Sequence, residues 1–317
     1  MRLLPAALGL VVLLLLVLNP NGVEARPAPA GGHQKKSSSN TFFVFGDDFA
    51  DNGNLPPTEP VTEMSRQWAY PYGSVYADAR DQILRLAATM LGLEEAPPAH
   101  ALTAEKTCDP SGMTFAYGGA GVLESTSHGV HTLRKQVDAF RKMVKDGTIS
   151  EKQLSHSVAL VAISGNDYAS ASVIGLSRPS DIKAYIGKVT KEIAANVEQL
   201  LKLGVTKVLV NNLHPIVKKN VHIVDLYAAF SSIVDHAPGK GSDLSKQFKR
   251  KLSPCCESLD SNGYCGQQGE SSSELLYTVC DKSGKFFYWD DKHPTHAGWE
   301  AIMKQLEKPL KEFVDQD

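Results

Sequence analysis

The chain has 317 residues, with 33 Lys plus Arg against 35 Asp plus Glu, and 42% of its residues are hydrophobic. This composition is that of an ordinary globular protein and excludes a disordered, collagen-like or coiled-coil chain as the main class. A formal net charge of −2 at pH 7 provides no electrostatic basis for binding nucleic acid or an anionic membrane, so we expect neither partner.

The first 25 residues have the features of a secretory signal peptide. Arg2 precedes an almost wholly apolar run of about 11 residues, which is too short to cross a bilayer of about 30 Å as a helix. A short buried helix or an uncleaved anchor is the alternative interpretation. No later segment has about 18 consecutive apolar residues, so we expect a secreted protein, or one in a secretory-pathway lumen such as the vacuole, with no membrane span. Residues 26–40 are rich in Pro, Gly, Lys and Ser and are predicted to form a flexible lead-in.

Residues 41–317 are predicted to form a single α/β domain, a three-layer α/β/α sandwich with a mostly parallel sheet. Apolar runs without alternation are typical of strands covered on both faces, and they occur at residues 41–45, 156–163 and 206–210, with a weaker one at 286–289. Apolar residues at spacings of three and four predict helices at about residues 81–91, 133–144, 182–201 and 295–313. Because ligands of such sheets bind at the carboxyl ends of strands, we expect the site after Phe45, Ile163 and Trp289.

The chain has five cysteines, at positions 108, 255, 256, 265 and 280. The last four are close in sequence, which in an oxidising compartment predicts disulfides that staple a long loop. A zinc site is the weaker interpretation, because the adjacent Cys255 and Cys256 are poorly placed as two ligands of one tetrahedral ion. The odd count leaves one thiol that is either free or paired with another chain.

Four short blocks near the predicted strand ends contain residues suited to chemistry. They are Phe45-Gly46-Asp47-Asp48 with Asp51-Asn52-Gly53-Asn54, then Phe115 to Ala120, then Gly165-Asn166-Asp167, and last Asp290 with His293-Pro294-Thr295. Each block alone has an ordinary explanation as a turn, a helix cap or a surface residue. Their order and separation together indicate a site.

In this order the blocks resemble those of the plant GDSL esterase/lipase family, within the SGNH hydrolase superfamily, from about Thr41 onward. The resemblance implies the SGNH hydrolase fold, an ester substrate, and no metal or other cofactor. In the family mechanism a serine attacks the ester carbonyl, a histidine removes its proton and an aspartate orients the histidine. The resemblance then implies that His293 is the base and Asp290 its orienting partner. The implied oxyanion donors are the Asp48 N–H, the Gly119 (or Gly118) N–H and the Asn166 side chain.

Asp48 stands where the family has its nucleophilic serine. A carboxylate has no proton for a base to remove, and two flanking carboxylates favour a protonated His293. We therefore expect a secreted protein with impaired serine-type hydrolysis that acts as a binding or regulatory module for a small-molecule ester or an acylated glycan. The alternative is an active hydrolase of lipid, acetylated-sugar or phenolic esters, in which Asp48 attacks directly or activates a water with His293. A third interpretation makes Asp48, Asp290 and His293 the ligands of an open zinc site.

Two other features bear on these hypotheses. Ser125 and Ser164 are the nearest alternative hydroxyls to the predicted site loops, and we interpret both as ordinary polar loop residues. After Tyr72-Gly73 the family usually has a Pro/Gly-rich loop that is shorter here, with Ala79 where a turn glycine is expected. The shorter loop fits an altered function. The sequence indicates no oligomeric state.

Overall fold

The computed structural model describes residues 40–316, apart from 59–60, 64, 74–81, 104–106, 124–128, 164, 174, 212–218 and 270–273; of residues 82, 83, 85 and 170–173 it describes the backbone. The predicted signal segment, the lead-in up to residue 39, the shortened loop, Ser125 and Ser164 lie outside the described residues. Every described element belongs to one compact unit, Ser38–Asp317.

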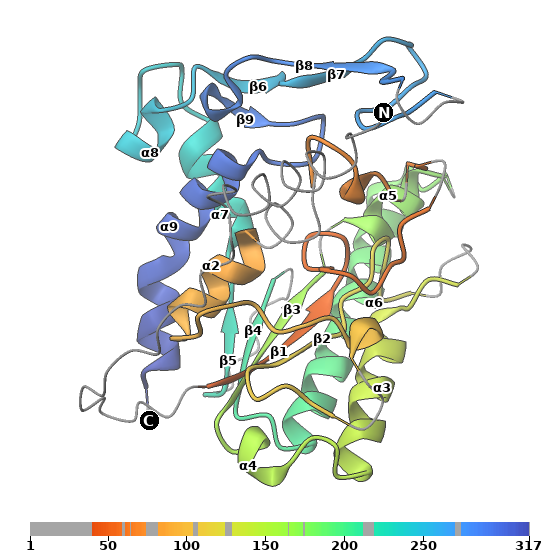
Figure 1. Cartoon of the computed structure of the whole chain (residues 1–317), viewed down its shortest axis with the longest axis vertical. Coiled ribbons are helices and arrows are strands. Elements are labelled where there is room, and N and C mark those ends of the chain that lie inside the picture. Colours follow the sequence, from red (N-terminus) through yellow and green to blue (C-terminus); the bar gives the residue numbers. More distant parts are fainter. Residues whose placement is uncertain are drawn as a thin grey trace, which may run out of the picture. The chain divides into compact units, whose positions relative to one another are not determined.

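Five parallel strands form the central sheet, in the order β2-β1-β3-β4-β5 (Figure 1). They are β1 (Thr41–Gly46), β2 (Gly112–Thr114), β3 (Ser157–Ala162), β4 (Lys207–Val210) and β5 (Val221–Ile223). The three strongest apolar runs form β1, β3 and β4, and the mostly parallel sheet is confirmed. No sequence pattern predicts β2 or β5, because strands of three residues are too short to show a period.

Helices cover both faces of this sheet, which confirms the predicted three-layer sandwich (Figure 1). One face carries α2 (Gln82–Met90), α7 (Leu226–Val234) and α9 (His296–Val314), and the other carries α3 (Leu133–Lys145) and α6 (Pro179–Lys202). Successive side chains of a strand point to opposite faces. Phe42 and Val44 of β1 therefore join the core beneath α9, whereas Phe43 and Phe45 join the core beneath α3 and α6.

The ends of the main helices follow local sequence signals. The hydroxyl of Thr295 accepts the Gly298 N–H at 3.0 Å and fixes the start of α9. At the end of α6, Gly204 has a φ of +103°, a conformation that favours glycine. The short helices are α4 (Glu151–Leu154), α5 (Asn166–Val173), α8 (Asp243–Lys246), η1 (Arg66–Trp68), η2 (His100–Leu102) and η3 (Ser283–Lys285). Among the described residues, no helix is both long and apolar enough to cross a membrane.

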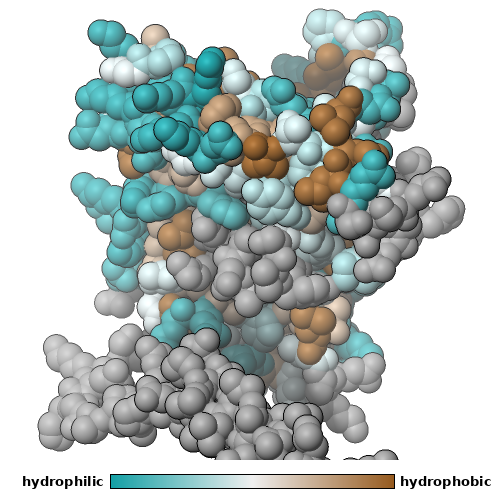
Figure 2. Space-filling view, turned by 45° about the horizontal axis from the view of Figure 1, so that its top comes forward, coloured by the Kyte–Doolittle hydropathy of each residue, from teal (hydrophilic) through white to brown (hydrophobic). Residues whose placement is uncertain are grey.

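Two smaller sheets lie beyond the carboxyl ends of the central strands (Figure 1). β6 (Arg250–Pro254) pairs with β9 (Phe286–Tyr288) in parallel, and β7 (Cys256–Ser258) pairs with β8 (Tyr277–Val279) in antiparallel fashion. The prediction for residues 286–289 was therefore wrong in one respect: the segment is a strand, but it pairs with β6 and not with the central sheet. Figure 2 turns this end toward the viewer and shows brown apolar surface among teal polar side chains.

Two disulfides staple this end of the molecule, as predicted. Cys255 is bonded to Cys280 and Cys256 to Cys265, so that residues 255–280, here termed the stapled loop, are closed twice. Cys108 is the free cysteine, and it is partly buried. Adjacent cysteines bond to different partners according to which segments of the chain lie opposite them in the fold. The spacing of cysteines in the sequence does not reveal this.

Candidate active site

Three loops at the carboxyl ends of neighbouring strands meet the loop that precedes α9. Asp48 lies on the turn after β1, Gly119 in the loop after β2, and Asn166 at the start of α5, after β3. Together with His293, from the loop between β9 and α9, these residues line one cavity of about 800 Å³. Asp290 lies against His293 in the same loop. The structure thus brings all five of the predicted site residues together.

The imidazole of His293 lies between two carboxylates. Its Nδ1 is 2.7 Å from Asp290 Oδ2, and its Nε2 is 3.4 Å from Asp48 Oδ2. The other oxygen of Asp290 accepts the backbone N–H groups of Lys292 and His293, at 2.8 and 2.7 Å. The side chains of Asp290, His293 and Asp48 are 8%, 20% and 22% exposed, so solvent screens their charges only in part.

These charges shift one another's pKa values. Burial acts to lower the pKa of His293, but the hydrogen bonds and charges of Asp290 and Asp48 outweigh it and raise that pKa to about 9. Burial also acts to raise the pKa of each carboxyl, but the hydrogen bond and charge of His293 hold both values below the ordinary one. At pH 7 the imidazole is therefore protonated between two carboxylates, and in that state it cannot accept a proton.

The Asp48 carboxylate also engages amide donors beside it. Asn166 Nδ2 donates to Asp48 Oδ1 at 3.3 Å and to the Ala120 carbonyl at 3.0 Å. The backbone N–H of Asp48 also faces the same residue's carboxylate and helps to lower its pKa. Of the two glycines, Gly118 donates its N–H to Asp51, whereas the Gly119 N–H has no acceptor among the residues that the structure describes. Two of the three predicted oxyanion donors therefore already contact an anion.

Asp51, from the first block, stabilises the chain next to the site. Its carboxylate accepts the N–H groups of Gly53, Asn54, Leu55 and Gly118 at 2.7–2.9 Å. These bonds tie the chain after β1 to the loop that carries Gly119. Burial nevertheless raises the pKa of Asp51.

We expect Asp51→Asn to lower the free energy of unfolding by about 2 kcal/mol, because the new amide cannot accept on its nitrogen side and leaves buried N–H donors without a partner. Urea unfolding followed by circular dichroism measures this change. Asp291→Asn is the matched control, since that side chain is 74% exposed, and its effect should stay within about 0.5 kcal/mol. Equal effects of the two substitutions would contradict the structural role of Asp51.

Three side chains that no sequence pattern indicated complete the site. Gln136 of α3 accepts the Gly46 N–H at 2.9 Å and donates to the Gly46 carbonyl at 2.8 Å, which fixes the strand end before Asp48. The Tyr72 hydroxyl donates to Asp290 Oδ2, and a guanidinium nitrogen of Arg66 lies 3.7 Å from the same oxygen. Contacts across so many residues leave no signal in local spacing, so only the fold reveals them.

The geometry does not favour a metal ion held by Asp48, Asp290 and His293. The two carboxylates lie on opposite ring nitrogens of the imidazole, so the three side chains do not converge on one point. In the described part of the chain, no group of three His, Cys, Asp or Glu side chains is arranged to hold a metal ion.

The cavity is lined by both apolar and polar side chains. Leu226, Phe230 and Val234 of α7, with Trp299 of α9, are here termed the apolar wall, although Ser231 and Asp235 of the same helix also line the cavity; Phe230 packs edge-on against Trp299 with ring centroids 5.9 Å apart. The polar wall, on the side of η1, includes Glu63, Arg66 and Gln67. The site can therefore accept a ligand with an apolar end and a polar end.

Comparison with known proteins identifies the family. The model of the GDSL-like lipase/acylhydrolase family matches residues 42–306. The Arabidopsis thaliana GDSL esterase/lipase At5g03610 is 30% identical to this chain, with 92% of the chain and 91% of the relative covered. For At3g09930 of the same plant the identity is 28%, with 89% and 92% covered, and for At5g03600 it is 29%, with 86% and 95% covered. The family match spans most of the described fold and all four blocks, and the chain belongs to the GDSL-like lipase/acylhydrolase family.

Proposed function

We propose that this protein binds an ester or acylated ligand in the GDSL-family site but carries out little or no serine-type hydrolysis, and that it acts as a binding or regulatory module. In this proposal Asp48 occupies the place of the nucleophile, His293 that of the base and Asp290 that of its orienting partner. One observation carries it: the Asp48 carboxylate lies 3.4 Å from His293 Nε2 and 3.3 Å from Asn166 Nδ2.

The size of the expected loss follows from the mechanism. Removing the nucleophile of a serine triad lowers kcat by about 10⁶-fold and leaves about 10³ to 10⁴ over water from the rest of the site. Here the rest of the site is impaired as well, because the Asp48 carboxylate binds the Asn166 amide that would otherwise stabilise an oxyanion. We therefore expect hydrolysis by the wild type close to background.

An active hydrolase remains the second candidate, because the relatives are named esterase/lipase and the Gly119 N–H has no acceptor in the described part of the chain. Asp48 would then attack the ester carbonyl itself, or take a proton from a water. The hydrogen bonds that hold the pKa of Asp48 low also make it a weak base and a weak nucleophile. Attack by the carboxylate would in addition form an anhydride, which is uphill from an unactivated ester.

The two walls of the cavity favour a small-molecule ester or an acylated glycan as the ligand. The acyl group would lie on the apolar wall of α7, and the alcohol or sugar part would face Glu63, Arg66 and Gln67. Tryptophan fluorescence can test this binding, because all three tryptophans of the chain, Trp68, Trp289 and Trp299, line the cavity.

We expect ethyl hexanoate to change the tryptophan fluorescence of the wild type in a saturable way and to be recovered intact. Leu226→Asn, on the apolar wall, should weaken binding several-fold, because it places an amide against the acyl chain. Leu252→Asn is the control, since Leu252 is 77% exposed on β6. Absence of a saturable signal would contradict the binding function, and conversion of the ester would favour the second candidate.

We further propose that the protein enters the secretory pathway, because two disulfides close the stapled loop and the first 25 residues fit a signal peptide. Thiol titration of the denatured protein should then return one thiol, Cys108, and five after reduction. In the native protein Cys108 should react slowly, because burial raises the pKa of its thiol to about 11. Five thiols without reduction would contradict the secretory assignment.

A further inference from the structure

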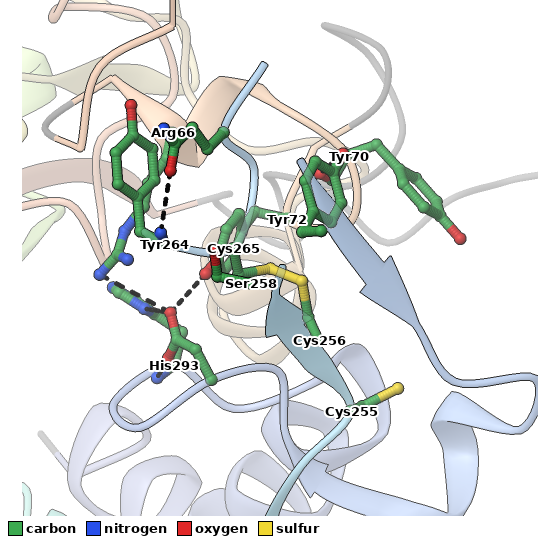
Figure 3. The surroundings of a disulfide bond; sticks show 12 residues. Arg66, Tyr70, Tyr72, Cys255, Cys256, Ser258, Tyr264, Cys265 and His293 are labelled. Carbon is green, nitrogen blue, oxygen red and sulfur yellow. Dashed lines mark hydrogen bonds and ion pairs between the residues drawn. A yellow bond between two sulfur atoms is a disulfide. The ribbon is translucent and has the colours of Figure 1, made fainter. Parts of the chain in front are cut away.

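One oxygen of Asp290 serves three partners, and two of them come from a segment far away in the sequence. Asp290 Oδ2 contacts His293 Nδ1, accepts the Tyr72 hydroxyl and faces the Arg66 guanidinium (Figure 3). Burial and the charge of Asp290 raise the pKa of Tyr72, so the phenol keeps its proton and remains a donor. One hydrogen-bond donor, Tyr72, and one cation, Arg66, thus share with His293 the charge of a single carboxylate oxygen.

Arg66 also contacts groups other than Asp290. Its side chain is 10% exposed, and its guanidinium lies 5.9 Å from the ring centroid of Tyr72 and 6.0 Å from that of Tyr264. Tyr264 belongs to the stapled loop, and its hydroxyl donates to the Val61 carbonyl at 2.8 Å. The cation therefore lies near two aromatic rings, one of which the stapled loop supplies.

The Cys256–Cys265 disulfide packs against this group (Figure 3). It forms a small buried cluster with Tyr277, against which Tyr72 lies. Gly266, the next residue, has a φ of +90°, and a Cβ placed there would be in ordinary van der Waals contact with the side chains of Arg66 and Tyr72, at 3.4 and 3.5 Å. The Tyr277 hydroxyl donates to the Tyr70 carbonyl at 2.5 Å. The stapled loop thus contacts the segment that carries Arg66 and Tyr72 at several points.

Building on the proposed pairing of Asp290 with His293, we propose that Arg66 and Tyr72 are positioning residues that withdraw negative charge from Asp290 and so limit how firmly His293 holds its proton. The Cys256–Cys265 disulfide keeps the two residues at that carboxylate. In this proposal the stapled loop helps to hold the side chains around Asp290 in place.

The expected sign follows from the charges around His293. A positive charge or a hydrogen-bond donor on Asp290 weakens the attraction between that carboxylate and the imidazolium, so removing it raises the pKa of His293. The other groups near the ring are Asp48 after β1, His296 of α9, whose pKa burial lowers, and the exposed pair Asp291 and Lys292. None of these is altered in the variants below.

The test measures the titration of His293 by NMR of the imidazole in the ligand-free protein. Arg66→Met and Tyr72→Phe should each raise the proton affinity of His293 by about three- to tenfold, which is about half to one unit in its pKa. Arg66→Lys keeps the charge and should stay close to the wild type. An unchanged or lowered pKa in both Arg66→Met and Tyr72→Phe would overturn the proposal.

The role of the Cys256–Cys265 disulfide can be tested with the Cys255–Cys280 disulfide as its control. Replacing Cys256 and Cys265 by serine should shift the pKa of His293 upward, whereas replacing Cys255 and Cys280 should leave it unchanged, because that disulfide lies outside the cluster around Tyr72. Equal effects of the two pairs would overturn the role of the disulfide. If the serine variants do not fold, Gly266→Val tests the same contact, because a side chain at φ +90° strains the backbone that lies against Arg66 and Tyr72, and the pKa of His293 should rise; an unchanged pKa would overturn the role of the stapled loop. These measurements use neither a ligand nor ester turnover. They can therefore contradict this proposal without contradicting the proposed binding function, and a failure of the binding function does not affect them.

Discussion

The Asp48→Ser variant is expected to hydrolyse short p-nitrophenyl esters at least about tenfold faster than the wild type, a barrier change of about 1.4 kcal/mol. The substitution supplies a hydroxyl next to His293 Nε2, and Asp290 is already in place on the opposite nitrogen. It also removes one of the two carboxylates that keep the imidazole protonated, and it releases the Asn166 amide for an oxyanion. Initial rates under identical conditions measure the gain.

Two variants separate this gain from other causes. Asp48→Asn removes the charge without supplying a hydroxyl, so it should remain at the rate of the wild type. The double variant Asp48→Ser with His293→Ala should lose the gain, because the new hydroxyl then has no base. A rate for Asp48→Ser no higher than that of Asp48→Asn would show that the remaining groups are not arranged for serine catalysis.

A second large effect is expected in the pH dependence of stability. The pKa of His293 is raised from 6.5 to about 9 in the folded protein, so its contribution to stability is fully present below pH 6.5 and is lost as the pH rises to about 9. The expected loss over this interval is about 3 kcal/mol. Asp48 and Asp290, whose pKa values are lowered, contribute above about pH 4, and this contribution is lost in more acidic solution.

Urea unfolding at a series of pH values measures this dependence. Asp48→Asn is the informative variant, because it removes one of the two charges that hold the proton on His293. Its stability should fall less steeply than that of the wild type between pH 6.5 and 9. Parallel curves for the two proteins would contradict the ion pair between Asp48 and His293.

The main elements of the fold follow from sequence patterns because they are long or strongly apolar. The continuous apolar character of β1, β3 and β4 reflects burial on both faces, and the period of α3, α6 and α9 reflects one buried face each. The partner of β9 could not be predicted, since an apolar run of three or four residues does not specify which strand lies beside it. Pairing with β6 depends on the path of the stapled loop.

Some residues of the candidate site could likewise be predicted from the sequence, whereas others could not. Asp48, Asn166 and His293 were indicated because each stands in a block with a family pattern, and the parallel sheet brings the ends of its strands to one edge. Arg66 and Tyr72 were not predicted, because no local sequence pattern indicates that they contact Asp290, which is more than 200 residues away in the sequence. The charge of His293 likewise depends on distances to two carboxylates, which no spacing in the sequence contains.

The most direct measurement compares the rate at which the purified wild type and His293→Ala hydrolyse p-nitrophenyl butyrate. If the imidazolium is locked between two carboxylates and Asp48 supplies no hydroxyl, both proteins should show the same rate, close to the uncatalysed one. Rapid turnover by the wild type that is lost in His293→Ala, and equally in Asp48→Ala, would contradict this account and establish a hydrolase that uses its aspartate.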